Sequence, residues 1–178
     1  MKKFTFNLLF FSLCTSVLIS CSNKTPENYF DIAVLNSNYL NGFANNGLSR
    51  ELESPSVKLV ENSTETVPMK RSEVIETKIQ FIDGQYDKVK SLKITDDTKD
   101  IIEASLALYE FVVPVYKTEY TELANLYDNG AKPEQTEQLT KLIHEKYFPR
   151  FDELYKNLIK AGKAYASKHN IKVNWGTD

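Results

Sequence analysis

Cysteine is scarce in this sequence, and its scarcity excludes several kinds of site. The 178 residues contain two cysteines, Cys14 and Cys21, and both lie near the start of the chain. Disulfide bonds, cysteine nucleophiles and cysteine-ligated metal sites are therefore excluded from everything that follows Cys21. We expect that part of the chain to be stabilised by packing.

The sequence also lacks the short motifs of common catalytic sites. It contains no GxGxxG, no P-loop, no GxSxG and no HExxH. A two-metal helical bundle needs a glutamate three residues before each ligand histidine, but Lys141 and Ala166 stand at that spacing before His144 and His169. We therefore expect no catalytic residue, no metal and no cofactor.

Each of the two histidines has an ordinary structural interpretation. We expect His144, which lies beside Glu145 and one step before the apolar stripe that begins at Tyr147, to lie at the rim of the core with its ring hydrogen-bonded. A partly buried proton carrier is the alternative. His169 is expected at a helix C-terminus, where the helix dipole favours a cation.

The chain has no basic stripe, which makes nucleic acid an improbable partner. Lysine and arginine number 22 against 24 aspartates and glutamates, a net charge of −2. Loss of an N-terminal segment containing Lys2 and Lys3 lowers this charge to −4. Nucleic-acid binding normally rests on clustered positive charge, so the composition argues against it.

The N-terminus has the pattern of a bacterial export signal that ends in a lipobox. Lys2 and Lys3 precede a mostly apolar segment, Phe4 to Ile19, which is shorter than the roughly 20 residues of a membrane-spanning helix. Leu18-Ile19-Ser20-Cys21 closes it, which predicts cleavage between Ser20 and Cys21 and lipidation of Cys21. The alternatives are a signal peptide cut elsewhere and an uncleaved anchor.

Lipidation of Cys21 implies a lasting membrane address, because several acyl chains hold a protein on a bilayer. Residue 22 is serine and not aspartate, which in Gram-negative lipoproteins favours the outer membrane. No acidic run follows Cys21, so we expect a periplasm-facing position, with surface exposure as the alternative. Residues 21–25 leave a tether reaching about 13 Å, which predicts a domain close to the lipid.

A long helix is predicted over residues 98–128, because apolar side chains recur there at alternating steps of four and three. Asp97, with Asp100 three residues on, is the expected N-terminal cap. Asn129-Gly130 is expected to end the helix in a left-handed turn. The stripe consists of Ile102, Leu106, Tyr109, Val113, Tyr116, Tyr120, Leu123 and Tyr127.

A second long helix is predicted from Pro133, a favoured first helical residue, to the vicinity of Asn170. Asn170 can cap its end, with Ile171 folding back onto the helix. The short connection to the preceding helix predicts an antiparallel hairpin. The stripe consists of Tyr147, Phe151, Leu154, Leu158, Ala161 and Tyr165.

A proline lies within each of these two predicted helices. Pro114 and Pro149 are at nearly equal distances along the chain from the turn between them, so they lie at one height in the hairpin. Paired kinks there predict a hairpin that bends as a unit. The alternative is that each proline starts a new, shorter helix.

A weaker pair of helices is predicted upstream. Thr25-Pro26-Glu27 begins the first, which frays or ends near Asn41-Gly42 or continues to Leu52. Residues 54–65 are expected to be a loop in which residues 57–60 form a short extended piece or a helical turn. The next helix is predicted from Val67 or Pro68 to Leu92.

Four helices without a convincing strand predict an all-α fold, an antiparallel four-helix bundle over residues 26–178. The segments Leu106–Phe111 and Tyr165–Val173, together with the lipobox, resemble a group of small all-helical lipoproteins of unknown function from Gram-negative bacteria, including Bacteroidetes. This resemblance covers the chain after the signal. It implies the fold and carries no activity or catalytic residue.

All ten tyrosines lie outside the signal segment, and they allow two interpretations. They form a core whose hydroxyls reach the wet rim, or they line a groove for a glycan, lipid headgroup or peptide. Trp175 either folds back on the bundle or projects as a contact residue. The groove hypothesis assigns five residues: Tyr116, Tyr120, Tyr127, Tyr147 and Trp175.

Taken together, these features favour a non-catalytic, membrane-anchored binding or envelope-assembly module. Its partner is expected to be a protein, a peptide or a glycan. The alternative is an inhibitor or immunity-type lipoprotein that neutralises an envelope-targeted enzyme. An enzyme is the third class, and it requires a pocket with a buried carboxylate or a cluster around His144.

Overall fold

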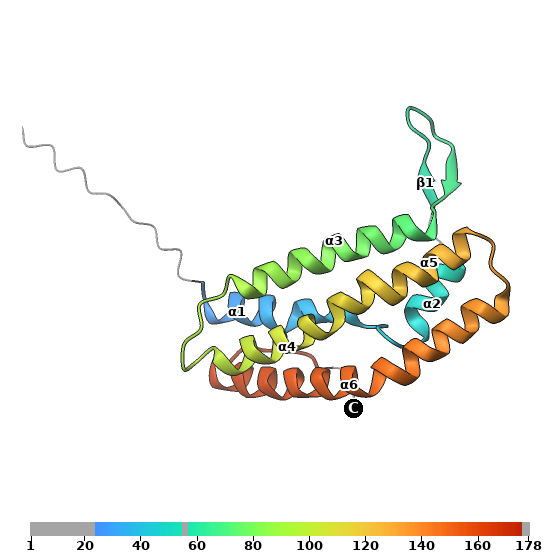
Figure 1. Ribbon diagram of the computed structural model, residues 1–178. Helices are drawn as coiled ribbons and strands as arrows, with labels where there is room; N and C mark the ends of the chain where they lie inside the picture. The colour runs from blue at the N-terminus through green and yellow to red at the C-terminus, as the bar shows by residue number, and fades with distance from the viewer. Residues whose placement is uncertain (1–23, 55–56, 176–178) are drawn as a thin grey trace, which may run out of the picture.

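The computed structural model describes residues 24–54 and 57–175, and they are mostly helical, as the sequence predicts (Figure 1). The signal segment, Ser20 and Cys21 lie outside the described residues. The helices are α1 (Pro26–Ala33), η1 (Leu35–Leu40, a 3₁₀ helix), α2 (Asn46–Glu53), α3 (Arg71–Lys90), α4 (Lys99–Val115), η2 (Tyr116–Tyr120, π-helical), α5 (Thr121–Asp128) and α6 (Pro133–Lys168). The strands are β1 (Val57–Leu59) and β2 (Thr66–Pro68).

The first helix begins where the sequence predicts, with a reciprocal cap. The Asn28 N–H donates to the Thr25 hydroxyl at 3.3 Å, and the Thr25 N–H donates to the Asn28 side chain at 3.2 Å. Pro26 occupies the first turn, where its missing N–H is no loss.

The first helix does not continue to Leu52. It gives way to η1 and then to a turn in which Gly42 and Ala44 have φ of +97° and +51°. The hydroxyl of Tyr120 accepts the N–H of Ala44 at 2.7 Å, and the Ala44 carbonyl lies 2.7 Å from Nδ1 of His144. Contacts from two distant helices thus hold this turn in place.

The strands of a small hairpin occupy residues where the sequence predicts only a loop and the start of a helix. β1 and β2 pair antiparallel, with Val57 opposite Pro68 and Leu59 opposite Thr66. The expectation of no strand is therefore wrong for this segment, although a short extended piece at residues 57–60 was one of the two alternatives. In Figure 1 the hairpin projects from the helices, and each of its described residues is exposed.

The helix expected from Val67 or Pro68 begins later, at Arg71, where Glu73 accepts the Lys70 N–H at 3.0 Å and a carboxylate from another helix accepts the next N–H groups. The Asp128 carboxylate accepts the N–H groups of Arg71 and Ser72 at 2.8 and 2.9 Å, and the Ser72 hydroxyl at 2.7 Å. Burial raises the pKa of Asp128, but these donors outweigh it and the pKa is lowered. Asp128, the last residue of α5, therefore fixes the start of α3.

The long helical run predicted over 98–128 is confirmed as the succession of α4, η2 and α5. Its cap residue is Thr98 and not Asp97. The Asp97 carboxylate instead lies 2.5 Å from Nζ of Lys168 and 2.9 Å from Nε2 of His169, because the end of α6 packs beside the start of α4. The hydrogen bond from Lys168, followed by the one from His169, lowers the pKa of Asp97.

Both predicted helix ends in the C-terminal half are confirmed. Gly130 has φ of +68°, and the Ala131 N–H donates to the Leu126 carbonyl at 2.9 Å. Asn170 has φ of +56°, and the Ile171 N–H donates to the Ala166 carbonyl at 2.9 Å. Such left-handed residues satisfy the last carbonyls of a helix, and the second one turns the C-terminal tail back along α6.

Pro114 and Pro149 each lie inside a helix, so neither proline starts a new one. The π-helical η2 follows Pro114 directly, which is consistent with the hydrogen bond that a proline cannot donate. In Figure 1, α6 changes direction between its orange and red parts.

One hydrophobic core joins the helices. Figure 1 shows α3, the α4–α5 run and α6 side by side with alternating directions, and α1 and η1 alongside them. Among the described residues, no helix is both long enough and apolar enough to cross a membrane. The largest fully buried side chains include Tyr109, Tyr116, Tyr120, Phe30 and Phe43.

Candidate ligand pocket

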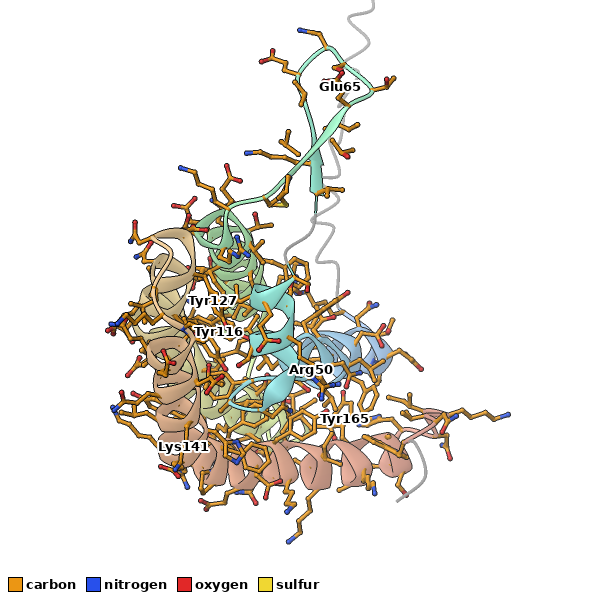
Figure 2. The ribbon with its side chains drawn as sticks, turned by 90° about the vertical axis from the view of Figure 1, so that its right-hand side faces the viewer. Arg50, Glu65, Tyr116, Tyr127, Lys141 and Tyr165 are labelled. Carbon is orange, nitrogen blue, oxygen red and sulfur yellow. The ribbon has the colours of Figure 1, made fainter. Side chains whose placement is uncertain are left out.

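The structure does not gather the five predicted groove residues into one groove. Tyr116 and Tyr120 are 2% and 1% exposed and lie in the core, with their rings stacked at 4.9 Å (Figure 2 shows Tyr116 among the packed side chains). Burial raises the pKa of Tyr120 to about 12. For these two tyrosines the core interpretation holds.

Tyr127 and Tyr147 are half-buried and lie apart from Trp175. The guanidinium of Arg71 lies 5.9 Å from the centre of the Tyr127 ring. The Tyr147 hydroxyl donates to the carboxylate of Glu119. Both rings are therefore held by neighbours within the fold, and neither lines the pocket that contains Trp175.

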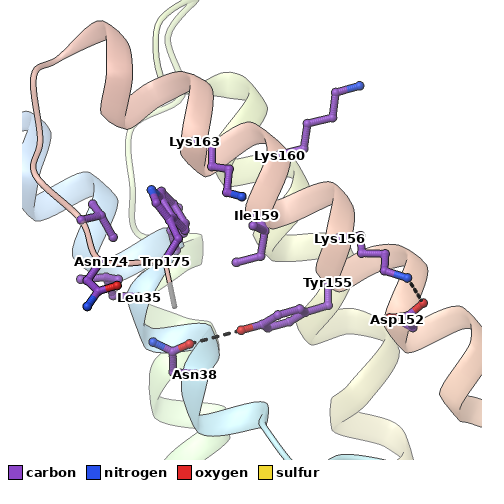
Figure 3. Close-up of a pocket in the computed structure, with 12 residues that line it drawn as sticks. Leu35, Asn38, Asp152, Tyr155, Lys156, Ile159, Lys160, Lys163, Asn174 and Trp175 are labelled. Atoms are coloured by element: carbon purple, nitrogen blue, oxygen red, sulfur yellow. Dashed lines mark hydrogen bonds and ion pairs between the residues drawn. The ribbon is translucent and has the colours of Figure 1, made fainter. Parts of the chain in front are cut away.

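Trp175 lines a surface pocket of about 590 Å³ between α6, η1 and the C-terminal tail (Figure 3). A volume of this order suits a small molecule. Three segments line it, with Leu35 and Asn38 from η1, Asp152, Tyr155, Lys156, Ile159, Lys160 and Lys163 from α6, and Val173 and Trp175 from the tail.

The α6 wall of the pocket follows from helical spacing. Positions three and four residues apart share one face of a helix, so Tyr155, Ile159 and Lys163 line up towards η1. The Tyr155 hydroxyl donates to Oδ1 of Asn38 at 3.2 Å and ties α6 to η1. Burial raises the pKa of Tyr155, so this hydroxyl keeps its proton.

The tail wall depends on Gly162. A Cβ at this position would lie 2.8 Å from Cγ1 of Val34 and 3.3 Å from the Trp175 ring. Glycine therefore allows both side chains to lie against α6. Trp175 also meets the ring of Phe30 edge-on at 5.8 Å, so the indole is packed on one side and faces the pocket on the other.

The pocket carries positive charge. Lys156 is neutralised by Asp152 at 2.6 Å, but among the described residues neither Lys160 nor Lys163 pairs with a carboxylate. Nζ of Lys163 lies 5.7 Å from the centre of the Trp175 ring. In Figure 3 Lys163 points towards Trp175, whereas Lys160 extends away from the pocket.

Sequence reasoning found Trp175 but missed its lysine neighbours. Lys156, Lys160 and Lys163 recur at steps of four and three, the same spacing that marks an apolar stripe. That signal places them on one helix face. It does not show that the tail returns to this face, which depends on the turn at Asn170.

A second, more apolar pocket of about 400 Å³ lies between η1, α2 and the start of α3. The rings of Tyr39 and Phe81 meet there edge-on at 4.5 Å, and both side chains are largely exposed. An ion pair of 2.8 Å joins Lys78 to Glu51 beside them. This pocket offers apolar surface with its charges already paired.

The described residues give no arrangement typical of catalysis. His144 is exposed, stacks on Phe148 at 5.0 Å and contacts the Ala44 carbonyl, which fits the rim interpretation. In residues 24–54 and 57–175, no three histidine, cysteine or acidic side chains are placed to hold a metal ion. Asp97 pairs with Lys168 and contacts His169.

No protein-family model, curated protein or solved structure significantly matches this chain.

Proposed function

We propose that the protein is a lipoprotein anchored through Cys21, and that its helical domain is a non-catalytic binding module of the cell envelope. The observation that carries the binding role is the pocket beside Trp175. It combines an accessible indole, apolar walls and the ammonium group of Lys163, which has no carboxylate partner among residues 24–54 and 57–175. Pockets of this kind fix a ligand by a few polar groups on a mostly apolar lining.

The lipobox and the start of α1 support the anchored position. Cys21 precedes the Thr25 cap by four residues, so the first helix starts within about 13 Å of the lipid. The outer membrane, facing the periplasm, is the proposed address, because Ser22 gives no inner-membrane retention signal. Surface exposure is the alternative.

For the architecture, we infer an antiparallel four-helix bundle. Its layers are the α1–η1–α2 segment, α3, the α4–η2–α5 run and α6. The alternating directions of the long helices and the single core support it. We further infer that Pro114 and Pro149 bend the last two helices together, since both prolines lie inside helices and face solvent.

Labelling with a palmitate analogue tests the anchor. We expect incorporation into the wild-type protein and its loss in Cys21→Ala, because the thiol is the acylated group. Equal labelling of the two proteins would contradict the anchor.

Cross-linking in living cells tests the binding role. A photoreactive side chain at Lys160, at the rim of the pocket, is expected to capture a reproducible ligand or partner. The matched control is Lys141, which is also exposed and on α6 but lies about 30 Å along the helix from Lys163. The binding role fails if neither position captures anything, or if both capture the same material.

The projecting hairpin favours a second candidate, an inhibitor or immunity-type lipoprotein. Val57, Leu59, Val60 and Val67 are 59%, 69%, 37% and 40% exposed on it. It lies at the start of α3, about 30 Å from the other end of that helix, which lies beside α1 (Figure 1). A photoreactive residue at Leu59 discriminates the two functions: this candidate predicts capture of an envelope enzyme that the protein inhibits.

A further inference from the structure

We propose that the pocket beside Trp175 binds a phosphate-bearing amphiphile, a molecule with a phosphoryl group next to an apolar segment. This inference rests on the proposed binding role and names its ligand. Two sources share this chemistry, an anionic phospholipid of the membrane and a free organic phosphate.

The charge at the pocket favours an anion. The chain as a whole is acidic, with a net charge of −2, yet Lys160 and Lys163 have no carboxylate partner among the described residues. Both lie within one Debye length of the pocket, roughly 8 Å at physiological salt, so both attract an anion to it. Lysine binds phosphate as a point charge, and Lys163 is the one that points inward (Figure 3).

The remaining walls favour an apolar segment beside that anion. Leu35, Ile159, Val173 and the exposed side of the Trp175 ring surround the space below Lys163. Tyr155 and Asn38 already satisfy each other at 3.2 Å. The lining thus places the ammonium group of Lys163, which has no carboxylate partner in the described part of the chain, next to apolar surface. This arrangement matches a phosphoryl group joined to a hydrocarbon.

The position of the pocket makes a lipid source reachable. Its η1 wall begins directly after the eight-residue helix α1, which spans about 12 Å, and α1 itself follows the tether. A phospholipid headgroup at the bilayer surface and a soluble organic phosphate therefore both have access, and the experiment separates them.

Trp175 is the only tryptophan in the chain, so its fluorescence reports this pocket. The full-length protein is placed in neutral phosphatidylcholine vesicles and titrated with hexyl phosphate, with hexanol as the matched neutral compound. In a second arm, phosphatidylglycerol replaces part of the vesicle lipid. A saturable change with hexyl phosphate alone identifies a soluble ligand, and a change with phosphatidylglycerol identifies a lipid source.

We expect Lys163→Gln to weaken the response about tenfold, the loss of one charge-assisted hydrogen bond. Lys163→Arg is expected to restore it and Lys141→Gln to leave it unchanged. The proposal is overturned if hexanol acts as well as hexyl phosphate, if neither arm saturates, or if Lys163→Gln binds as the wild type does. The soluble arm does not depend on lipidation. If hexyl phosphate does not bind but position 160 still captures a partner in cells, the ligand assignment is wrong and the proposed binding role remains supported.

Discussion

Gly162 and Gly84 both lie inside long helices, but the structure predicts opposite effects for the same substitution at the two positions. At Gly84 a Cβ meets nothing within 4 Å. At Gly162 it lies 2.8 Å from Cγ1 of Val34, a side chain that is 1% exposed. Gly84→Ala is thus the matched control for Gly162→Ala.

The magnitudes follow from two opposing effects. Alanine in a helix interior is favoured over glycine by about 1 kcal/mol, because glycine loses more backbone entropy on folding. At Gly162 the added methyl group displaces Val34 or Trp175, and overpacking of this kind costs about 1–3 kcal/mol. We therefore expect Gly84→Ala to stabilise by up to about 1 kcal/mol and Gly162→Ala to be neutral or to destabilise by up to about 2 kcal/mol.

Urea unfolding followed by circular dichroism measures both free energies, and Trp175 fluorescence reports the site directly. We expect the emission spectrum to change in Gly162→Ala and to stay as in the wild type in Gly84→Ala. Only the first substitution adds a methyl group against Val34 and the Trp175 ring. If Gly162→Ala stabilises as much as Gly84→Ala and leaves the spectrum unchanged, the close packing of the tail against α6 is refuted.

Two further substitutions test the polar contacts between distant helices. Asp128→Ala removes the cap of α3 and is expected to lower the free energy of unfolding by roughly 1–2 kcal/mol at neutral pH. The pKa of Asp128 is lowered from 3.8, so its stabilisation is present above that value and is lost as pH falls through the folded-state pKa. A difference from wild type in urea midpoint that stays constant as pH falls through this range would contradict the ionised cap. Tyr120→Phe leaves the buried N–H of Ala44 without an acceptor and should cost about 1–3 kcal/mol, whereas Tyr39→Phe, at an exposed side chain, should cost little. Equal urea midpoints for these two variants would refute the role of the Tyr120 hydroxyl.

The long helices of the C-terminal half could be predicted because their signals are local. The apolar stripes repeat over many turns, and their ends are marked by Pro133, Gly130 and Asn170, each of which acts through its own backbone geometry. The apolar periodicity predicts where a helix lies, but it does not identify the capping residue. Asp97 is a good cap by type, but it pairs with the end of α6 instead.

The segment between α1 and α3 could not be predicted, because distant contacts decide its conformation. Ala44 is bonded to Tyr120 and His144, which lie 76 and 100 positions further along the chain. The start of α3 likewise has two acceptors, the local Glu73 carboxylate for the Lys70 N–H and the distant Asp128 carboxylate for the Arg71 N–H. Neighbouring residues include neither partner of Ala44, so the sequence predicts the end near Asn41-Gly42 and the extended piece at residues 57–60 only as alternatives, and it does not predict the pairing of β1 with β2.

The pocket combines Trp175, which the sequence singles out, with lysines of α6 that it does not. Trp175 folds back on the bundle, because one side of its ring packs on Phe30 and the other faces the pocket. Gly162 and the turn at Asn170 already hold the tail against α6. A ligand would not have to order the tail, so binding would cost less conformational entropy than binding to a mobile tail. A ligand there also touches α6, η1 and the tail together. It therefore stabilises their packing by mass action, by about 2.7 kcal/mol at a hundred times its Kd.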